Sequence, residues 1–528
     1  MAAPGFRQDI WNELRTTLPA QLPGYLVRQR WFGGKARKFQ STEVTDVVSL
    51  RRDQFEALVL FVRVEYVSSG ADHYAIPVVG HTVVSDEETV PVLRVPGENG
   101  REMILRDAFT NEEFRSLLLD AIQKGSIFRG EHGEIRTSCT KALSAYNAAA
   151  LSALRPKSIK AEQSNSSIAY GERAILKFFR RLEEGINPDL EIGTFLTEIA
   201  HYQHTPQLLG ALEYRHRDGW KATQGILQTY VPNQGDAWQY TLETISHFYK
   251  EAAEQSGDTS KVATAEDVPE PARSSVNAYL ASAGLLAQRT AELHIALASD
   301  SRDPVFAPEP FDDSFRHRFE QSVLDLTKDV FGLLRQRITQ LPDGVREKGK
   351  QIAGRENEIA ERFHFALSKP IRATRIRIHA DYHLGQVLYT GKDFVIIDFE
   401  GEPARPLSER RMKRSPLQDV AGMLRSFHYA AYAPLLAQVG TAQVDTSKIA
   451  TLSVWAEAWN RWVAERFLSE YLKKSQTATF LPSNSEELRI LLQVHLLEKA
   501  VYELGYELNN RPSWVGIPLA GITKALEI

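Results

Sequence analysis

The stretch IRIHADYHLGQVLYTGKDFVIIDFEGE, residues 376–402, decides the fold of this chain. Its pattern predicts a strand that ends at His379, a polar loop that carries Asp381, and two short strands joined by a Gly-Lys turn. The second strand of this hairpin stops at Asp398. We therefore expect the carboxylates of Asp381 and Asp398 at neighbouring strand ends, close enough to share a substrate and a metal ion.

The order and spacing of three polar residues in this stretch match phosphoryl-transfer chemistry. Kinase-type phosphotransferases place a base Asp, then a metal-binding amide, then a second metal-binding Asp on the next strand. Here Gln386 follows Asp381 by five residues, and Asp398 takes the third place. Magnesium prefers carboxylate and amide oxygens, and an acceptor hydroxyl needs a carboxylate within hydrogen-bond reach. The alternative is a pair of strand-end aspartates that only cap turns, but the ordered set of three favours catalysis.

The composition excludes several other classes of protein. The 528 residues are 43% hydrophobic and 25% charged, which is ordinary for a globular chain of two to four structural units. A net charge of -4 gives no reason to expect nucleic acid or an anionic membrane as partner. The single cysteine, Cys139, forms no internal disulfide, and the first residues lack the features of a signal peptide. No apolar run is long enough to span a bilayer, so we expect a cytoplasmic protein.

The chain order predicts three parts: an N-terminal β-rich cap at 1–90, an intermediate region with a nucleotide-binding sheet at 91–235, and a mainly helical lobe at 236–528. In the cap, a helix from residue 8 precedes strands at 44–50, 57–66 and 74–79. Residues 91–154 read as helical, most clearly at 112–123. The predicted fold class is therefore α+β.

Lys177 is the candidate for holding nucleotide phosphates. It lies amid apolar residues on the second strand of a predicted hairpin, and a kinase fixes such a lysine with a glutamate from the following helix. Glu191 is preferred to Glu198, because it lies in the first turn of that helix. The alternative is a strand lysine that extends to solvent. No GxGxxG precedes it; the hydroxyls of Ser164 and Ser166 are the candidates to cover phosphate.

The strand that ends at Gln228–Val231 runs into a Pro/Gly connection, as a hinge between two lobes does. Backbone groups near Tyr230 and Val231 can read an adenine edge, although an ordinary strand exit gives the same pattern. Long helices follow at 283–298, 315–340, 345–367 and 487–509, and residues 251–275 read as an exposed loop. His294 on the first of these helices is expected to be packed rather than metal-bound. Asp419 opens a further helix and is expected to accept hydrogen bonds from backbone amides of the Asp381 loop.

The last long helix carries a polar face. Lys499, Tyr502, Glu503 and Tyr506 recur at helical spacing, and Arg511 follows. Aromatic platforms beside charged hydrogen-bonding groups suit a sugar. A helix-packing surface is the alternative.

Long motifs in a fixed order give the chain a family resemblance. They are QRWFGGKARK (29–38), EQSNSS (162–167), LKFFRRLEEGINPDLEIGTFLTE (176–198), QTYVPNQGD (228–236), HADYHLGQVL (379–388), IIDFEGEPARPLSERRMKRSPLQDVAGMLRSF (396–427) and YELNNRPSWVGIPL (506–519). In these motifs the chain resembles the bacterial maltokinases over nearly its whole length. The Ala of HADYH stands where Gly is common in that family, a change expected to have little effect unless the backbone there needs positive φ.

The resemblance implies a kinase-like fold of the aminoglycoside-phosphotransferase type with an N-terminal cap. It implies transfer of phosphate from ATP to the anomeric hydroxyl of maltose, with Mg²⁺, for α-glucan synthesis from trehalose, and trehalose synthase as a partner. The roles that it implies are a base (Asp381), metal ligands (Gln386, Asp398, Glu400), nucleotide contacts (Lys177 paired with Glu191) and sugar contacts (His379, Arg405, Lys499, Tyr502, Glu503, Tyr506, Arg511). Two other functions remain open: a kinase of another sugar such as glucosamine, and a non-catalytic scaffold that binds trehalose synthase.

Overall fold

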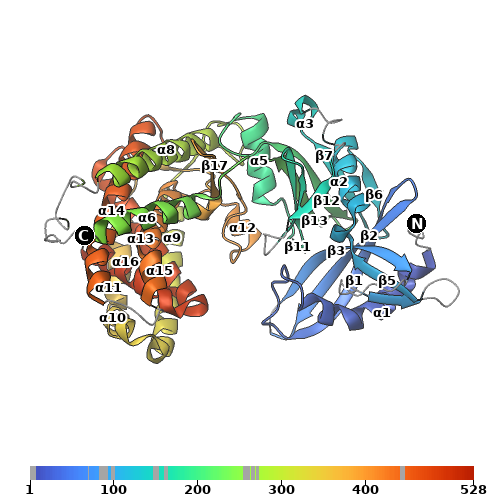
Figure 1. Cartoon of the computed structure of the whole chain (residues 1–528), viewed down its shortest axis with the longest axis horizontal. Coiled ribbons are helices and arrows are strands. Elements are labelled where there is room, and N and C mark those ends of the chain that lie inside the picture. Colours follow the sequence, from blue (N-terminus) through green and yellow to red (C-terminus); the bar gives the residue numbers. More distant parts are fainter. Residues whose placement is uncertain are drawn as a thin grey trace. The chain divides into compact units, whose positions relative to one another are not determined.

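The computed structural model describes residues 8–68, 70–82, 93–96, 102–146, 151, 154–159, 165–253, 262, 268, 273–439 and 446–527. The chain divides into two compact units, Met1–Pro232 and Asn233–Ile528 (Figure 1). The first unit holds both large β-sheets, and the second is mainly helical. The three-part division drawn from the sequence stays a prediction.

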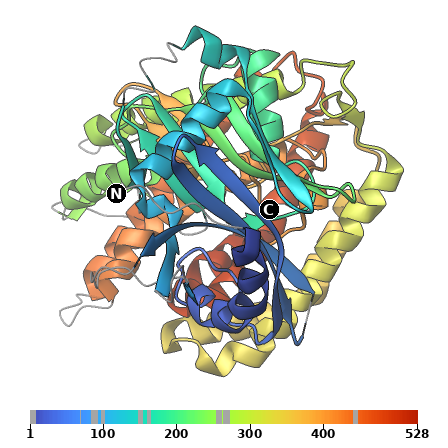
Figure 2. The same cartoon turned by 90° about the vertical axis from the view of Figure 1, so that its right-hand side faces the viewer.

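The first sheet is antiparallel, with the strand order β1-β2-β3-β5-β4. Its strands are β1 (Phe39–Arg52), β2 (Phe55–Tyr66), β3 (Ala71–Thr82), β4 (Leu93–Pro96) and β5 (Glu102–Asp107). Helix α1 (Gln8–Leu26) packs against β1 and β4 (Figure 2). Leu14, Leu18 and Leu22 recur every fourth residue of α1, so one face of the helix is apolar and enters the core of this sheet.

The second sheet has the strand order β6-β7-β12-β13-β10-β9-β8. Its strands are β6 (Ile127–Arg129), β7 (Gly133–Cys139), β8 (Pro156–Ile159), β9 (Asn165–Tyr170), β10 (Ala174–Phe179), β12 (Leu208–His216) and β13 (Lys221–Thr229). The helices of this region are α2 (Glu112–Lys124), α3 (Lys141–Ala145) and α5 (Pro188–Glu198). The hairpin predicted around Lys177 is confirmed: this residue lies opposite Ser167 of β9 and Ile226 of β13.

The prediction that residues 91–154 are mostly helical is wrong, because strands β4 to β7 lie there. In β7 the buried residues Gly133, Ile135 and Thr137 alternate with more exposed ones. Strands of three to seven residues give too few repeats for a period of two to be recognised. The helix predicted at 112–123 is confirmed as α2.

Two aspartates, one buried and one half-buried, connect the two sheets of the first unit. Asp46 of β1 accepts a hydrogen bond from the backbone N–H of His132 at 3.1 Å and one from the hydroxyl of Tyr214 on β12 at 2.7 Å. Asp107 of β5 accepts two from Arg180, at 2.8 and 3.0 Å. Arg180 directly follows the strand that carries Lys177. Charge-assisted bonds of this kind therefore connect the N-terminal sheet to that strand.

The second unit is built mainly from helices, most of them long. They are α6 (Ala237–Ala253), α8 (Arg273–Leu297), α9 (Asp313–Arg337), α10 (Asp343–Ala353), α11 (Glu356–Leu367), α12 (Leu407–Arg410), α13 (Leu417–Val439), α14 (Thr446–Lys474), α15 (Ser485–Asn510) and α16 (Gly516–Glu527). The short hairpin of β16 (Val387–Tyr389) and β17 (Phe394–Ile396) confirms the one predicted from residues 376–402. The helix predicted at 345–367 breaks into α10 and α11 at Gly354, a residue of low helix propensity. The loop predicted at 251–275 lies largely outside the described residues.

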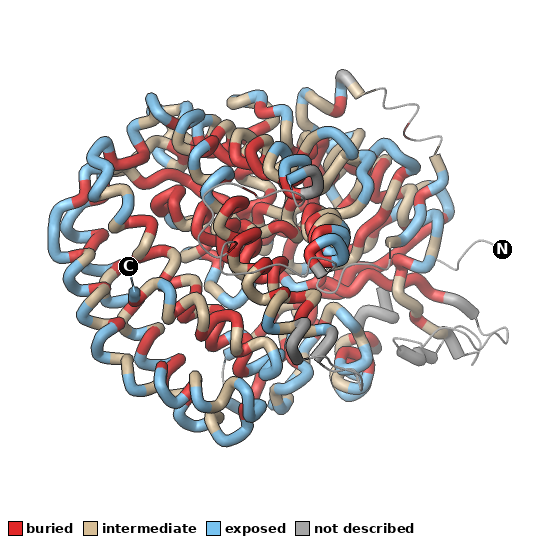
Figure 3. The backbone as a smooth tube through the Cα atoms, turned by 60° about the vertical axis from the view of Figure 1, so that its left-hand side comes forward, coloured by how far each residue is buried: buried red, intermediate tan, exposed pale blue. Residues whose placement is uncertain are grey.

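Buried and exposed stretches alternate along the helices (Figure 3). In α9, Phe315, Phe319, Val323 and Val330 are buried and form one apolar stripe. Such a stripe covers only one face of the helix and packs it on its neighbours. In the described ranges, no helix combines the length and the apolar character that crossing a membrane requires.

Candidate active site

The loop that carries Asp381, residues 379–386, is called the Asp381 loop below. Its backbone enters the left-handed region at Ala380, where φ is 68°, a conformation that side chains with a Cβ rarely adopt. Asp419, in the first turn of α13, accepts hydrogen bonds from the N–H groups of His379 at 2.8 Å and Ala380 at 2.9 Å. This is the contact that the sequence predicts for Asp419. The positive φ is the exception named with the sequence-based expectation, so alanine in place of glycine does matter here.

A fully buried network supports Asp419. The Nε2 atom of His294 on α8 lies 3.1 Å from the Asp419 carboxylate, and its Nδ1 atom lies 2.8 Å from the hydroxyl of Tyr471 on α14. The hydroxyl of Tyr382, next to Asp381, bonds to Thr290 of α8 at 2.8 Å. Three helices therefore fix the Asp381 loop, and His294 is packed, as the sequence predicts.

The side chain of His379 packs inside the protein, and the sugar contact that the resemblance implies for it stays a prediction. Its side chain is buried, and its Nε2 atom lies 2.9 Å from the backbone carbonyl of Ile397. Its ring packs between Tyr382 and Phe399. The residue therefore links the Asp381 loop to the strand end before Asp398.

The carboxylate of Asp381 lies between two basic groups. Lys499 Nζ and His383 Nε2 are each 4.0 Å from its oxygens. Burial lowers the pKa of the His383 imidazole; Asp381 opposes this shift and Lys499 adds to it. A neutral imidazole and a carboxylate next to an ammonium group leave Asp381 able to accept a proton or a hydrogen bond from a hydroxyl.

The β16–β17 hairpin carries the predicted metal ligands. Gln386 directly precedes β16, and its backbone carbonyl accepts a hydrogen bond from Ile397 at 3.0 Å. Asp398 follows β17 with φ of 68°, and Asp398 and Glu400 have carboxylate oxygens within 4.8 Å of one another. Carboxylate and amide oxygens are the ligands that Mg²⁺ prefers, so these residues fit such an ion.

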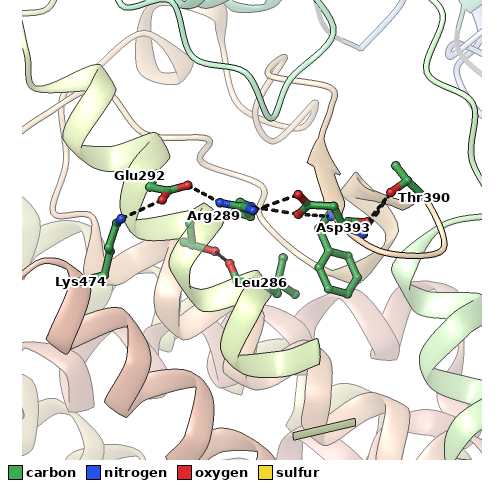
Figure 4. Close-up of polar contacts among 8 residues, drawn as sticks. Leu286, Arg289, Glu292, Thr390, Asp393 and Lys474 are labelled. Atoms are coloured by element: carbon green, nitrogen blue, oxygen red, sulfur yellow. Dashed lines mark hydrogen bonds and ion pairs between the residues drawn. The ribbon is translucent and has the colours of Figure 1, made fainter. Parts of the chain in front are cut away.

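A row of charges anchors this hairpin to two helices (Figure 4). Asp393, in the turn between β16 and β17, receives two hydrogen bonds of 2.9 Å from Arg289 on α8. Arg289 also bonds to Glu292 at 2.9 Å, and Glu292 lies 2.8 Å from Lys474 on α14. The bidentate bond restrains the guanidinium and the turn together, and so holds the hairpin that carries Gln386 and Asp398 at its ends in a fixed position.

A cavity of about 710 Å³ opens next to Asp381, within the size range of ligand pockets. One side of it is a face of α15, called the acceptor wall below: Lys499, Tyr502, Glu503, Tyr506 and Glu507. The other residues that line it come from the start of α6, the Asp381 loop, residues 402–404, α13 and the chain after α15: Asp236, Trp238, Asp381, His383, Gly385, Glu402, Pro403, Ala404, Gly422, Ser426, Tyr429, Arg511 and Trp514. The helical face that the sequence assigns to a sugar thus lines a cavity that also contains Asp381.

Carboxylates of the acceptor wall are matched by arginines. Arg425 donates to Glu503 at 2.6 and 2.8 Å, and Arg511 donates to Glu507 at 2.6 and 2.9 Å. Burial, reinforced by Glu402, raises the pKa of the Tyr502 hydroxyl, so this hydroxyl stays protonated. The wall therefore offers hydroxyl donors and compensated carboxylates.

Arg405 lies apart from the large cavity. It lines a void of about 30 Å³ together with Ala380 and Lys499, and its guanidinium is 3.6 Å from Glu409. The structure therefore places it behind the Asp381 loop, and its implied sugar contact stays a prediction.

In the first unit, the partner found for Lys177 is Asp189. Its ammonium lies 3.3 Å from that carboxylate, which is buried in the first turn of α5. This contact was not predicted from the sequence, and the partner preferred there, the half-buried Glu191 two residues further on, stays a prediction. The signal was present in Asn187 and Pro188, which cap and open the helix and so place Asp189 at its beginning.

The other predicted nucleotide contacts lie on β9 and at the end of β13. The hydroxyl of Ser166 accepts a hydrogen bond from Arg180 at 2.8 Å, whereas Ser164 lies outside the described residues. Gln228 is on β13, and the N–H of Tyr230 just after it bonds to the carbonyl of Arg173 at 2.9 Å. Val231 follows, and the roles of these residues toward a nucleotide stay predictions.

Sequence reasoning missed several residues that line the cavity, among them Trp238, Ser426 and Tyr429. They lie on α6 and α13, far in sequence from the acceptor wall. Nothing in their local patterns separates them from residues that pack helices together. Only the fold brings them to the cavity.

Comparison with known proteins agrees with the sheets and helices described above. Residues 25–108 match the family described as "Maltokinase N-terminal cap domain". A glucosamine kinase of Streptacidiphilus jiangxiensis is 23% identical over 376 residues, 70% of this chain and 73% of that protein. One from Mycolicibacterium smegmatis is 23% identical over 378 residues, 70% of this chain and 79% of that protein.

Solved structures show the fold. One of glucosamine kinase superposes with a TM-score of 0.64 at 18% identity, and covers 98% of this chain and 100% of its own. Another, in complex with glucosamine, ADP and inorganic phosphate, gives a TM-score of 0.60 at 18% identity, with 92% and 93% covered. The predicted α+β fold class is confirmed: the chain shares the fold of these glucosamine kinase structures, and its β-rich N-terminal region matches the cap-domain family.

Proposed function

We propose that this chain is a kinase that transfers phosphate from ATP to the anomeric hydroxyl of maltose and forms maltose 1-phosphate. The observation that carries the proposal is the position of Asp381, whose carboxylate borders a cavity lined by aromatic side chains and hydrogen-bonding groups. The matched cap domain and the fold shared with glucosamine kinases support a sugar kinase. In the cell, we expect the product to serve α-1,4-glucan synthesis in the cytoplasm, with trehalose synthase as a partner.

In this proposal, the chain's own residues mainly orient the reactants and stabilise charge. Asp381 accepts the hydrogen bond of the attacking hydroxyl and takes its proton. Lys177, held by Asp189, binds phosphate oxygens of the nucleotide. Gln386, Asp398 and Glu400 would hold Mg²⁺, which when bound neutralises charge on the phosphates. The strained and firmly bonded Asp381 loop keeps its carboxylate in one position, so little reorganisation is needed during transfer.

The dimensions of the acceptor wall favour an acceptor larger than one sugar ring. From Lys499 to Arg511 the chain advances by about 18 Å, because an α-helix rises about 1.5 Å per residue. At the far end, Trp514 lies under the guanidinium of Arg511 at 4.5 Å, and its ring stacks on Tyr429 with centroids 6.1 Å apart. Aromatic groups in the lining of the cavity suit a sugar, whose CH faces stack on such platforms.

A glucosamine kinase is the second candidate, because several carboxylates border the cavity and because the relatives above carry that name. An amino sugar carries an ammonium group and needs a carboxylate without a competing cation. The two carboxylates of the acceptor wall, Glu503 and Glu507, are both bound to arginines, which favours the neutral sugar at this wall. A scaffold without activity that binds trehalose synthase is the weakest candidate, because it has no physical need for Asp381, Gln386 and Asp398 together.

The test is a panel of sugars incubated with ATP and magnesium. It includes maltose, glucose, glucosamine and an aminoglycoside, and phosphorus NMR reads the position of the new phosphate. We expect maltose to react fastest and to carry the phosphate on its anomeric oxygen. A preference for glucosamine, or a phosphate elsewhere on the sugar, would contradict the proposal.

A further inference from the structure

Arg425 of α13 lies behind the acceptor wall. Its side chain is 7% exposed, and it donates two hydrogen bonds to Glu503, at 2.6 and 2.8 Å. Glu503 lines the cavity, whereas Arg425 lies outside the residues that line it. The positive charge of Arg425 thus lies outside the cavity, next to the carboxylate of Glu503, which lines the cavity.

The position of Arg425 is shaped by its neighbours. Its Nη1 atom bonds to Nδ1 of His428 at 2.8 Å, and its guanidinium lies 5.7 Å from the centre of the Tyr429 ring. Gly521 of α16 packs against the guanidinium so closely that a Cβ there would collide with it. A glycine at this contact leaves room for the guanidinium, which is buried and hydrogen-bonded to both Glu503 and His428.

His428 can accept this hydrogen bond only in its neutral form. Burial, and after it the charge of Arg425, lowers the pKa of His428 well below its ordinary value. The three groups therefore form a chain in which His428 and Glu503 both accept from one buried cation. Removing any member leaves a buried polar group without its partner.

We propose that Arg425 is a specificity-determining residue that makes the cavity select an uncharged sugar over an amino sugar. This inference rests on the proposed function only in taking the cavity beside Asp381 as the acceptor site. With Arg425 in place, the carboxylate of Glu503 is already compensated, so the ammonium group of an amino sugar loses its hydration and gains little in return. Without Arg425, the same carboxylate becomes a partner for that ammonium group.

The test compares glucose and glucosamine, which differ in one hydroxyl or amino group. Dissociation constants of both sugars are measured by calorimetry, at a pH at which the amino group is protonated, for the full chain and its variants. In the wild type we expect glucose to bind more tightly. In Arg425→Met, the preference should move toward glucosamine by about tenfold or more, which corresponds to about 1.4 kcal/mol.

Two further variants separate charge from folding. Arg425→Met combined with Glu503→Gln removes both charges, and its preference should return to within about threefold of wild type. Glu503→Gln alone leaves an uncompensated arginine and should move the preference further toward glucose, so the inference stays testable if Arg425→Met does not fold. Arg316→Met is the matched control, because Arg316 is a buried arginine on α9 that pairs with Asp313 at 3.1 Å, away from the cavity.

Several results would overturn the inference: a wild type that prefers glucosamine, equal shifts in Arg425→Met and Arg316→Met, or a double variant that keeps the shift of the single one. Failure of the proposed function looks different. If maltose is not phosphorylated but the wild type still binds glucose more tightly than glucosamine, and the shifts are as expected, the assigned substrate is wrong and the role of Arg425 stands.

Discussion

The Asp381 loop and the acceptor wall hold their polar side chains in place by different interactions. The loop holds Asp381 through its backbone, because Ala380 has a φ of 68° and because Asp419 accepts hydrogen bonds from two amide groups of the loop. The wall lies on a regular helix, and its side chains are held by pairs between ions, such as Glu503 with Arg425. Backbone strain fixes one carboxylate at one point, whereas ion pairs set the charge of a surface that must accept a whole sugar.

This difference predicts where substitutions act. Changes in the Asp381 loop and in its support should lower turnover, because they remove or displace the group that handles the proton. Changes behind the wall should alter which sugar binds and how stability depends on pH. The predictions below test this division.

The largest effect is expected for Asp381→Ala. Turnover should fall by at least about a hundredfold, because general base assistance is lost. The fold should be unaffected, as the melting temperature will show. Asp218→Ala, at a side chain that is 86% exposed, is the control and should retain full turnover. If the folded Asp381→Ala variant had near-normal turnover, the assignment of Asp381 as the general base would be wrong.

Asp419→Asn should come next. An amide has one oxygen instead of two, so one of the amide hydrogens of His379 and Ala380 loses its acceptor, at a cost of about 1–3 kcal/mol of unfolding free energy. Turnover should also fall by about tenfold, because the loop is less firmly held. Urea unfolding and initial rates measure the two effects.

The control for that variant is Asp312→Asn. Asp312 caps α9 by accepting one hydrogen bond from the N–H of Phe315 at 2.7 Å, and asparagine caps a helix equally well. Stability and turnover should therefore hardly change. If both variants behave alike, the special role of Asp419 in the loop is wrong.

His428 gives a pH test of the region behind the wall. Its folded pKa is lowered by burial, so the unfolded chain binds this proton more readily than the folded one. At pH values above the ordinary histidine pKa of about 6.5, His428 should therefore not lower the unfolding free energy. At pH values below about 6.5, the unfolding free energy should decrease by up to about 1.4 kcal/mol per pH unit. His428→Gln keeps an acceptor for Arg425 but cannot titrate. In this variant the dependence of unfolding free energy on pH should be weaker, by the uptake of up to one proton on unfolding. Equal slopes in urea titrations at several pH values would show that His428 is not held neutral.

The same division explains what the sequence could predict. The Asp381 loop is continuous in sequence, so spacing alone placed Asp381, Gln386 and Asp398 around one hairpin. Lys177 was found on its strand, but its partner Asp189 was not predicted, because helix boundaries, and so the first-turn residues, are uncertain by one or two positions when read from sequence. The pairing with Glu191 stays a prediction. Periodicity found the face of α15. Arg425 and Trp238 come from other helices, and no local pattern distinguishes them from packing residues.

The smallest effect, Ala380→Gly, tests the strain itself. A left-handed conformation costs a residue with a Cβ about 1–2 kcal/mol, and glycine is free of this cost but loses more chain entropy on folding, about 0.5–1 kcal/mol. The balance should raise the unfolding free energy by about 0.5–1 kcal/mol. The same substitution at Ala421, inside α13, should lower it by a similar amount, because there the helix has no strain to relieve. If both variants are destabilised alike, the Asp381 loop is not strained at Ala380, and its rigidity must come from Asp419 alone.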